Sequence, residues 1–532
     1  MKIKYSKIIL LALTLLSSSS CKKFLIHDNP SGVTDAEWWK TEAHAYGALG
    51  SIYAGIPAGS NGRNVMFWSG LSDEAVCRGD FRGNYDIYTR GLQNSTWDVA
   101  EWIWRDDYID IRRACRFLEN VDKCFMDDDL RSRMKYEARA LRAFYHMEIM
   151  LFFGDIPIVT ASLTPATNHL KRDPAQKVYD FIISELKDCA DHLPQEYASD
   201  ETWRISAGTC NALIARLALF YHHYDVARDA AAKVINSGVY KLYRSEKQGM
   251  NNYAELFSYV GELNKERIFF KASGCDNAWT TFAPYGIGGE TYVSPTATVV
   301  DNFETKQGKT PAELGPDSVA IYRKNPNYNN NRDPRFLASI LYPGEQYLDA
   351  NYILSPFDNA TGNTDKIGVQ KSTATGYWIR KYLDPRDRQG RGGSLDFMII
   401  RYSEVLLIYV ESLIELDDWK NPAIAQHLND IRTRAGMPVV DQQKYNSAAM
   451  LRQLVRRERQ SELAFEGQRY FDIRRWGIVK QVMNGEVLGA TNPQTGVAVK
   501  VQDRSYMDRD YLWPIPEKET LSNPEMKQNA GY

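Results

Sequence analysis

The sequence predicts a mainly α-helical fold in which paired amphipathic helices carry a loop-rich region with minor β structure. Apolar residues recur at three- and four-residue steps through much of the first half of the chain, and again after residue 402. Between about residues 240 and 400 this periodicity disappears except over short stretches, and Gly, Asn, Pro and Tyr accumulate. The composition, 44% hydrophobic and 25% charged over 532 residues, lies in the globular range and favours two or three lobes.

The first 21 residues predict export followed by membrane anchoring. Three lysines within the first seven residues precede an apolar run, Ile8–Leu16, and four serines then lead to Cys21. This order is typical of a signal peptide, residues 1–20, that is removed before a cysteine. The apolar run is too short to span a bilayer, which needs roughly 20 apolar residues. We expect Cys21 to be the lipidation site and residues 22–32 to be a tether; an ordinary secretory signal is the alternative.

Three amphipathic helices are expected in the next part of the chain. Apolar positions at helical spacing define the first two, around Ile111–Val121 and Met134–Tyr145. The second is expected to end at Gly154, because glycine terminates helices well and Pro157 cannot continue one. Val178–Cys189 marks the third helix.

The segment Ser206–Ile235 predicts two further helices with a break near Tyr224. Small residues on the second one, Ala227 and Ala231, allow the helices to approach closely. This arrangement resembles helix pairs of the tetratricopeptide type, and we expect three or four such pairs in the chain. A pair of this kind cannot bury its apolar faces alone, so the pairs must stack on their neighbours.

Helices return after the loop-rich region. We expect them at Tyr402–Leu416, at Pro422–Ala435 and at Ala448–Glu466. Pro422 suits the first turn of a helix, and Gly436 suits the position just past the end of one.

Four charged residues near the end of the last of these helices are spaced at three or four residues. They are Arg459, Glu462, Glu466 and Arg469. We expect them to pair with one another along one helix face, because removing the partner of a buried charge costs about 3–5 kcal/mol. A catalytic carboxylate pair is the alternative, but each carboxylate has an arginine nearby.

Charge and cysteine content exclude several kinds of protein. With 65 basic and 67 acidic residues, the chain lacks the positive field that nucleic acid binding requires. Disulfides are possible in an exported chain, but no Cys-x-x-Cys pair occurs and three cysteines occupy apolar positions of helical patterns, which favours mostly free thiols. The three are Cys115, Cys189 and Cys210, and the full set of cysteines after Cys21 is Cys77, Cys115, Cys124, Cys189, Cys210 and Cys275. We expect no cofactor; the scattered histidines indicate no metal site, and calcium bound by loop oxygens is left open.

Motifs distributed along the chain carry a family resemblance. They are SDE (72–74), NRDPRF (331–336), GYWIRKY (376–382), IRYSEVLLIYVESL (400–413), LNDIRTRAGMP (428–438), RRERQSELAFEGQRYFDIRRW (456–476), YLWPIPEKET (511–520) and NPEMKQNAGY (523–532). In order and spacing these motifs resemble the SusD/RagB family over nearly the whole chain. The resemblance implies a SusD-like fold, with residues 21–235 as a helical part and residues 236–532 as a C-terminal part that carries the loop-rich insertion.

The same resemblance implies a function. Members are cell-surface-facing outer-membrane lipoproteins without catalysis, which bind glycans and deliver them to a SusC-like TonB-dependent transporter. Two alternatives stay open: a surface glycoside hydrolase, because 67 acidic residues include many possible carboxylate pairs, and a peptide-binding member of the family. No Gly-x-Ser-x-Gly motif occurs, and the sequence before Gly308 lacks the first glycine of a phosphate loop.

Two non-helical stretches, Arg78–Tyr88 and Asp276–Tyr292, combine aromatic rings with planar polar groups. A glycan needs rings for its C–H faces and amide or guanidinium donors for its hydroxyls. The candidate ligand contacts are Arg78, Asp80, Phe81, Arg82, Asn84, Tyr85, Asn277, Trp279, Tyr285 and Tyr292, with Trp279 and Tyr285 the strongest. The alternative for each ring is packing within its own loop, and the two arginines would also suit an acidic sugar. Trp97, Trp102 and Trp104 are weaker candidates, because their spacing around a helix start favours packing.

Overall fold

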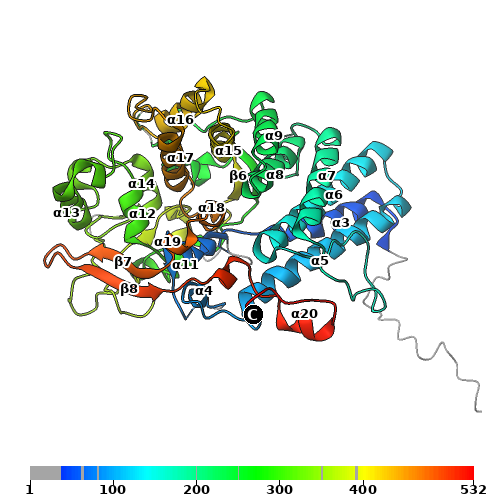
Figure 1. Cartoon of the computed structure of the whole chain (residues 1–532), viewed down its shortest axis with the longest axis horizontal. Coiled ribbons are helices and arrows are strands. Elements are labelled where there is room, and N and C mark those ends of the chain that lie inside the picture. Colours follow the sequence, from blue (N-terminus) through cyan, green and yellow to red (C-terminus); the bar gives the residue numbers. More distant parts are fainter. Residues whose placement is uncertain are drawn as a thin grey trace, which may run out of the picture.

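A computed structural model describes residues 38–532 apart from 61–64, 81–82, 199, 248, 250, 349–351 and 390–392. The predicted signal peptide, Cys21 and the tether lie outside the described residues, as do Phe81 and Arg82. Among the helices of the described part, none has both the length and the apolar character needed to cross a membrane. Helices dominate the fold, which confirms the mainly α-helical prediction (Figure 1).

The helices form an N-terminal group and a C-terminal group, with shorter helices between them. The first group is α3 (Glu42–Ala54), α4 (Asp86–Thr89), α5 (Asp98–Asn120), α6 (Asp128–Phe153), α7 (Ala175–His192), α8 (Ala207–Phe220) and α9 (Tyr224–Asn236). The loop-rich region holds α10 (Asn252–Leu256), α11 (Ala278–Phe282), α12 (Ala297–Asn302), α13 (Pro316–Lys324) and α14 (Pro334–Ser339). The last group is α15 (Tyr402–Glu415), α16 (Pro422–Arg434), α17 (Ala448–Glu462), α18 (Gln468–Arg475), α19 (Val479–Val482) and α20 (Glu517–Ser522). Short 3-10 helices are η2 (Val65–Leu71), η3 (Val121–Lys123), η4 (Tyr259–Gly261), η5 (Tyr285–Ile287), η6 (Ala312–Leu314), η7 (Tyr328–Asn330), η8 (Pro385–Gln389) and η9 (Asp508–Tyr511).

The long helices stack in chain order. Each of α5 to α9 packs against the next, α15 packs against α9, and α16 and α17 pack against α15 (Figure 1). The predicted helix ends are present: α6 stops at Phe153, followed by Gly154 at φ 76°, and α9 begins at Tyr224 after a three-residue break. This is the stacked arrangement of helix pairs that the apolar periodicity predicted.

The strands of the described residues form two-stranded antiparallel ladders, which confirms the prediction of minor β structure. The ladders are β1 (Ala75–Cys77) with β3 (Val293–Pro295), β2 (Arg267–Lys271) with β6 (Phe397–Arg401), β4 (Ile340–Leu341) with β5 (Trp378–Ile379), and β7 (Gly485–Thr491) with β8 (Ala498–Arg504). Among the described strands, only β7 and β8 are joined by a short turn, residues 492–497. The other three ladders join distant segments, so they fix where the loops of the insertion lie.

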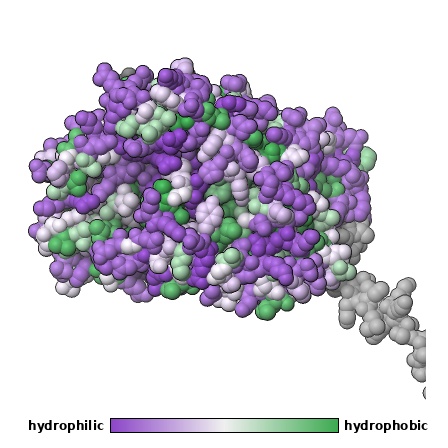
Figure 2. All heavy atoms as spheres, viewed as in Figure 1, coloured by the Kyte–Doolittle hydropathy of each residue, from purple (hydrophilic) through white to green (hydrophobic). Residues whose placement is uncertain are grey.

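A large buried core extends through both halves of the chain, and a smaller one lies between α15, α16 and α17. The large core includes residues on both sides of residue 235. The two predicted parts, 21–235 and 236–532, therefore share this core, and their division stays a prediction. All six described cysteines are buried free thiols, as expected. On the face shown in Figure 2, hydrophilic residues cover most of the surface and hydrophobic residues occur in small groups.

The last long helix is shorter than predicted. α17 ends at Glu462 rather than Glu466, because the chain reverses through left-handed conformations at Phe465 (φ 63°) and Gly467 (φ 78°). A Cβ atom on Gly467 would lie 2.7 Å from Cγ1 of Val65, so this turn packs tightly against η2.

The four charged residues predicted to pair along one helix face do not pair with one another. Arg459 pairs with Asp472 (2.9 Å), Glu462 with Arg401 (2.6 Å), Glu466 with Lys381 (2.8 Å) and Arg469 with Asp73 (2.7 Å). The prediction is wrong for two reasons. The helix stops at Glu462, which turns Glu466 and Arg469 toward other elements, and within the helix Arg459 and Glu462 find their partners on other segments rather than in each other.

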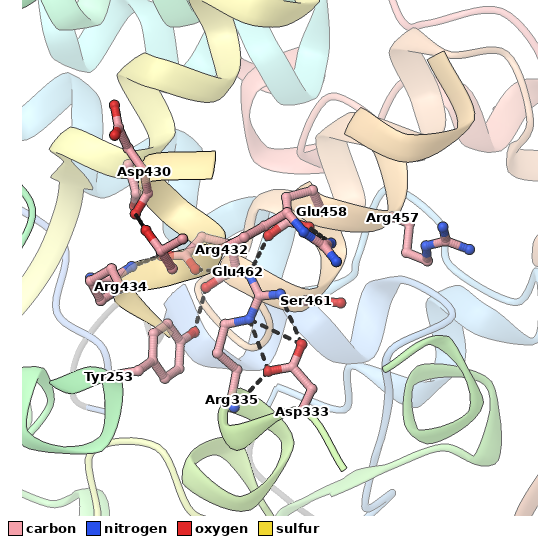
Figure 3. Close-up of polar contacts among 12 residues, drawn as sticks. Tyr253, Asp333, Arg335, Asp430, Arg432, Arg434, Arg457, Glu458, Ser461 and Glu462 are labelled. Atoms are coloured by element: carbon pink, nitrogen blue, oxygen red, sulfur yellow. Dashed lines mark hydrogen bonds and ion pairs between the residues drawn. The ribbon is translucent and has the colours of Figure 1, made fainter. Parts of the chain in front are cut away.

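These residues belong to a larger set of buried charges, which we call the buried ion network. Its members are Glu266, Asp333, Arg335, Lys381, Arg401, Arg432, Arg434, Glu458, Glu462 and Glu466. Arg335 lies at the centre of Figure 3, with bonds to Asp333 (2.8 Å), Glu458 (2.5 Å) and Glu462 (3.2 Å). At the edge of the network, Arg432 also pairs with the buried Glu304 over 2.8 Å, and Glu304 pairs with Arg457 over 3.0 Å. Each cation of the network lies against at least one carboxylate, and the network ties the loop-rich region to α16 and α17.

Candidate functional site

The two stretches predicted to hold ligand contacts meet at the β1–β3 ladder. Cys77 lies opposite Val293, and the amide of Arg78 donates to the carbonyl of Tyr292 over 2.8 Å. The loop that follows β1 and the loop that precedes β3 therefore leave the ladder side by side. An N-terminal loop and the insertion together form one surface here.

Side chains from both loops, and one from a third, form a compact group that we call the Tyr292 cluster. Its members are Arg78, Asp80, Tyr285, Glu290, Tyr292 and Lys371. The Arg78 guanidinium lies over the Tyr292 ring, 4.5 Å from its centroid, and donates to Asp80 (2.5 Å) and to the carbonyl of Glu290 (2.5 Å). Lys371 donates to the Glu290 carboxylate over 2.8 Å, and its ammonium group lies 5.9 Å from the centroid of the Tyr285 ring.

The charges of the cluster are paired with one another. The Tyr292 hydroxyl and Lys371 both donate to the Glu290 carboxylate. Burial raises the pKa of Glu290, but these hydrogen bonds outweigh burial and leave the pKa below its ordinary value. Burial, together with Glu290, raises the pKa of Tyr292 to about 12. At neutral pH the cluster therefore presents an ionised carboxylate, a neutral phenol and two cations with carboxylate partners.

Tyr285 is the more open ring of the cluster. It is 39% exposed, whereas Tyr292 is half-buried and has the Arg78 guanidinium over one face. Sequence reasoning identified both rings, together with Arg78 and Asp80, but missed Glu290 and Lys371. Glu290 lies inside the predicted stretch Asp276–Tyr292, but it was not chosen because the candidates there were aromatic rings and amides. Nothing in the sequence around Lys371 indicates a site.

Two of the predicted ligand contacts are buried rings. Trp279 is 4% exposed, its indole N–H donates to the carbonyl of Ile287 over 3.0 Å, and it stacks on Tyr347 at 16° with centroids 6.5 Å apart. Tyr85 is 2% exposed and contacts the ring of Phe67. These two rings have no open face for a sugar, so the packing alternative fits them and the predicted contacts need correction.

The remaining candidates flank the cluster. Asn277 is half-buried at the start of α11, and Asn84, at φ 50°, turns its amide toward Asp86 and the carbonyl of Gly79. Phe81 and Arg82 are outside the described residues. Trp97 and Trp104 are buried and Trp102 is partly buried, in agreement with the expectation that these rings pack.

The turn that carries Tyr285 is held from behind by a buried pair. The hydroxyl of Tyr352 donates to the carboxylate of Asp365 over 2.7 Å, and the amide of Gly286 donates to the same carboxylate. A Cβ atom on Gly286 would lie 2.9 Å from the Tyr352 ring, so the turn approaches that ring closely. Asp365 and Tyr352 thus position the exposed ring next to them.

Residues 245–532, more than half of the chain, match the family model described as "SusD family". The chain belongs to the SusD family. A second model, "Starch-binding associating with outer membrane", matches residues 81–219. These matches confirm the resemblance seen in the motifs.

Relatives of the SusD family extend over almost the whole chain. The chain is 25% identical to SusD-like protein P2 of Formosa agariphila, with 98% of each sequence covered. A SusD-like carbohydrate binding protein from Bacteroides fragilis has a structure similar to this one, with a TM-score of 0.82, 25% identity, and 92% of this chain and 100% of that one covered. A laminarin binding SusD-like protein shares the fold, with a TM-score of 0.69, 21% identity, and coverage of 93% and 100%.

Proposed function

We propose that this protein is a non-catalytic glycan receptor of the bacterial cell surface. The observation that carries the proposal is the Tyr292 cluster, where the exposed ring of Tyr285 and the half-buried ring of Tyr292 lie beside donors and acceptors in fixed positions. Rings can cover the C–H faces of sugars, while Arg78, Lys371 and Glu290 can bind hydroxyl groups at the edges. The related Bacteroides fragilis protein, which is described as carbohydrate binding, supports the same function.

The paired charges favour a neutral or weakly charged glycan. An anionic sugar would have to displace Asp80 from Arg78 or Glu290 from Lys371 before it could reach either cation. Affinity electrophoresis against neutral polysaccharides of different linkage, and against uronate and sulfated ones, tests the proposal. Retardation by at least one neutral polysaccharide is expected; retardation by none, or binding of a peptide instead, would contradict it.

The carboxylates of the cluster do not suit glycoside hydrolysis. A general acid needs a raised pKa, but the pKa of Glu290 is lowered and its oxygens accept from Lys371 and Tyr292. Incubation of the best polysaccharide with the purified protein should release no new reducing ends. Sustained release would favour the hydrolase alternative.

We further propose that acylated Cys21 anchors the receptor to the outer membrane, facing outward, and that it delivers its glycan to a SusC-like TonB-dependent transporter. The N-terminal sequence pattern supports the anchor, and membership of the SusD family supports the partner. Cys21→Ser is expected to move the protein from the membrane to the soluble fraction. A pull-down from detergent-solubilised membranes should recover a barrel protein, and its absence would count against delivery.

The Asp365–Tyr352 pair predicts a test of ring positioning. Tyr352→Phe removes one donor to Asp365, so we expect the free energy of unfolding to fall by about 1 kcal/mol. We expect glycan affinity to fall about threefold, because the Tyr285 turn loses support. The control is Tyr322→Phe, which removes a hydroxyl that accepts from Asn331 over 3.0 Å, away from the cluster. The free energy of unfolding of the control should fall by a similar amount, and its glycan affinity should equal that of the wild type. Equal affinity in both variants would rule out the positioning role.

A further inference from the structure

A second pocket, built from residues outside the Tyr292 cluster, lies between α5, the segment 157–170 and α20. It encloses about 300 Å³. Figure 1 shows α20 beside α5, although the two helices are almost 400 residues apart in the sequence. The size suits a small molecule rather than a protein segment.

Hydrogen bonds hold the three walls of this pocket together. The Tyr108 hydroxyl on α5 donates to the carbonyl of Pro157 over 2.9 Å. The Asn523 amide, just after α20, donates to the carbonyl of Leu170 over 2.7 Å. Each wall is thus tied to the 157–170 segment, so the pocket is preformed rather than opened by a ligand.

The interior of the pocket is apolar. Trp104, Val159 and Met526 are buried and line it, and Leu163 is partly buried. Ile109 also lines the pocket and remains 43% exposed. An apolar chain or ring can therefore enter from solvent past Ile109 and lie against buried apolar side chains.

Two arginines, one histidine and one carboxylate line the pocket. They are Arg105, Arg112, His169 and Glu519. Arg105 already pairs with Asp106 over 2.8 Å, but Arg112 is exposed and makes no ion pair or hydrogen bond within the described part of the chain. Burial raises the pKa of Glu519, the one carboxylate among the residues that line the pocket. The polar end of a ligand here meets at least one cation without a partner.

We propose that this pocket binds an amphiphilic anion, a molecule with one carboxylate or phosphate head and an apolar body. The apolar interior takes the body, and Arg112, with His169 beside the same pocket, takes the head. The lining holds a single carboxylate, which does not suit a metal ion, and its two rings, Trp104 and Tyr108, are buried and half-buried. The proposal does not depend on glycan binding by the Tyr292 cluster.

Isothermal titration with three ligands of the same chain length tests this. The full chain carrying Cys21→Ser, which has no acyl group of its own, is titrated with decanoate, decyl phosphate and decanol, each as dissolved monomer. At least one anion is expected to bind roughly tenfold more tightly than decanol. Preference for decanoate indicates a fatty acid as the natural ligand, and preference for decyl phosphate a phosphorylated lipid. Equal binding of all three, or binding of none, would overturn the proposal.

Variants separate the head contact from the apolar contact. Arg112→Gln should lower the affinity for the preferred anion roughly tenfold and leave decanol unchanged, whereas Arg112→Lys should retain most of it. Ile109→Glu should weaken all three ligands. Arg228→Gln is the matched control, because Arg228 is an exposed arginine on α9, remote in sequence and paired with Asp229. The assignment would be contradicted if the control lost anion binding, or if Arg112→Gln kept the affinity of the wild type. Glycan retardation should be unchanged in every variant.

Discussion

Glu462→Gln is expected to lower the free energy of unfolding by about 3–5 kcal/mol. The Glu462 carboxylate is fully buried and accepts from the guanidinium groups of Arg335, Arg401 and Arg434. Figure 3 shows Glu462 with Arg335 and Arg434 beside it. Burial raises the pKa of this carboxyl, but the three arginines, Arg434 first, outweigh burial and hold the pKa well below its usual range. A neutral amide would leave a surplus of buried positive charge that water cannot reach.

Chemical denaturation of the wild type and of Glu462→Gln measures this effect. The matched control is Glu486→Gln, because Glu486 pairs with Lys500 over 2.9 Å on the surface, where an ion pair contributes about 0–1 kcal/mol. If the free energy of unfolding fell by the same small amount in both variants, the network would be unimportant for stability.

The same pair of proteins has a predicted pH dependence. The folded-state pKa of Glu462 is depressed, so its contribution to stability is present above the unfolded-state pKa, about 4.3, and declines as the pH falls below that value. The difference in stability between the wild type and Glu462→Gln should therefore be constant from about pH 5 to 8 and become smaller near pH 3. A difference that grew on acidification would show that the sign is wrong.

The second large effect is expected at the Tyr292 cluster, the proposed glycan site. Tyr292→Ala should weaken binding of the best polysaccharide by roughly 30-fold, or about 2 kcal/mol, because it removes a stacking face and the ring beneath Arg78. Tyr285→Ala should weaken it less, because Tyr285 lies at the edge of the cluster. Affinity electrophoresis of each variant on the same gel measures the change.

Two controls make this result specific. Tyr328→Ala removes a tyrosine of equal exposure, 40% against 39% for Tyr285, outside the cluster, and should bind as the wild type does. Trp279→Ala removes a buried ring and should act through stability, by about 3–5 kcal/mol, rather than through direct contact. Full retardation by the Tyr292→Ala and Tyr285→Ala double variant would place the glycan site elsewhere.

The sequence predicted the helices well because their signals are local. Apolar spacing identified α6, and Gly154 with Pro157 identified where it ends. The partners of the charges on α17 could not be predicted, since Arg335 and Arg401 reach Glu462 from segments more than 60 positions earlier in the chain. Charge spacing along one helix shows that partners are needed, but it does not show where they are.

The candidate site was predicted in part for a similar reason. Composition located both loops, but their meeting depends on β1 and β3, strands of three residues each, which are too short to give a pattern. Ring type alone did not show that Trp279 faces inward and Tyr285 outward. Lys371 comes from a third loop and only the folded chain places it beside Glu290.

The ion pair between Asp73 and Arg469 has a consequence for biogenesis. Asp73 is synthesised almost 400 residues before Arg469. Until the later segment is made, early charges lack the counterions that make their burial tolerable, so the body cannot consolidate before most of the chain is complete. A chain terminated before Arg456 should accordingly fail to fold and be prone to aggregation.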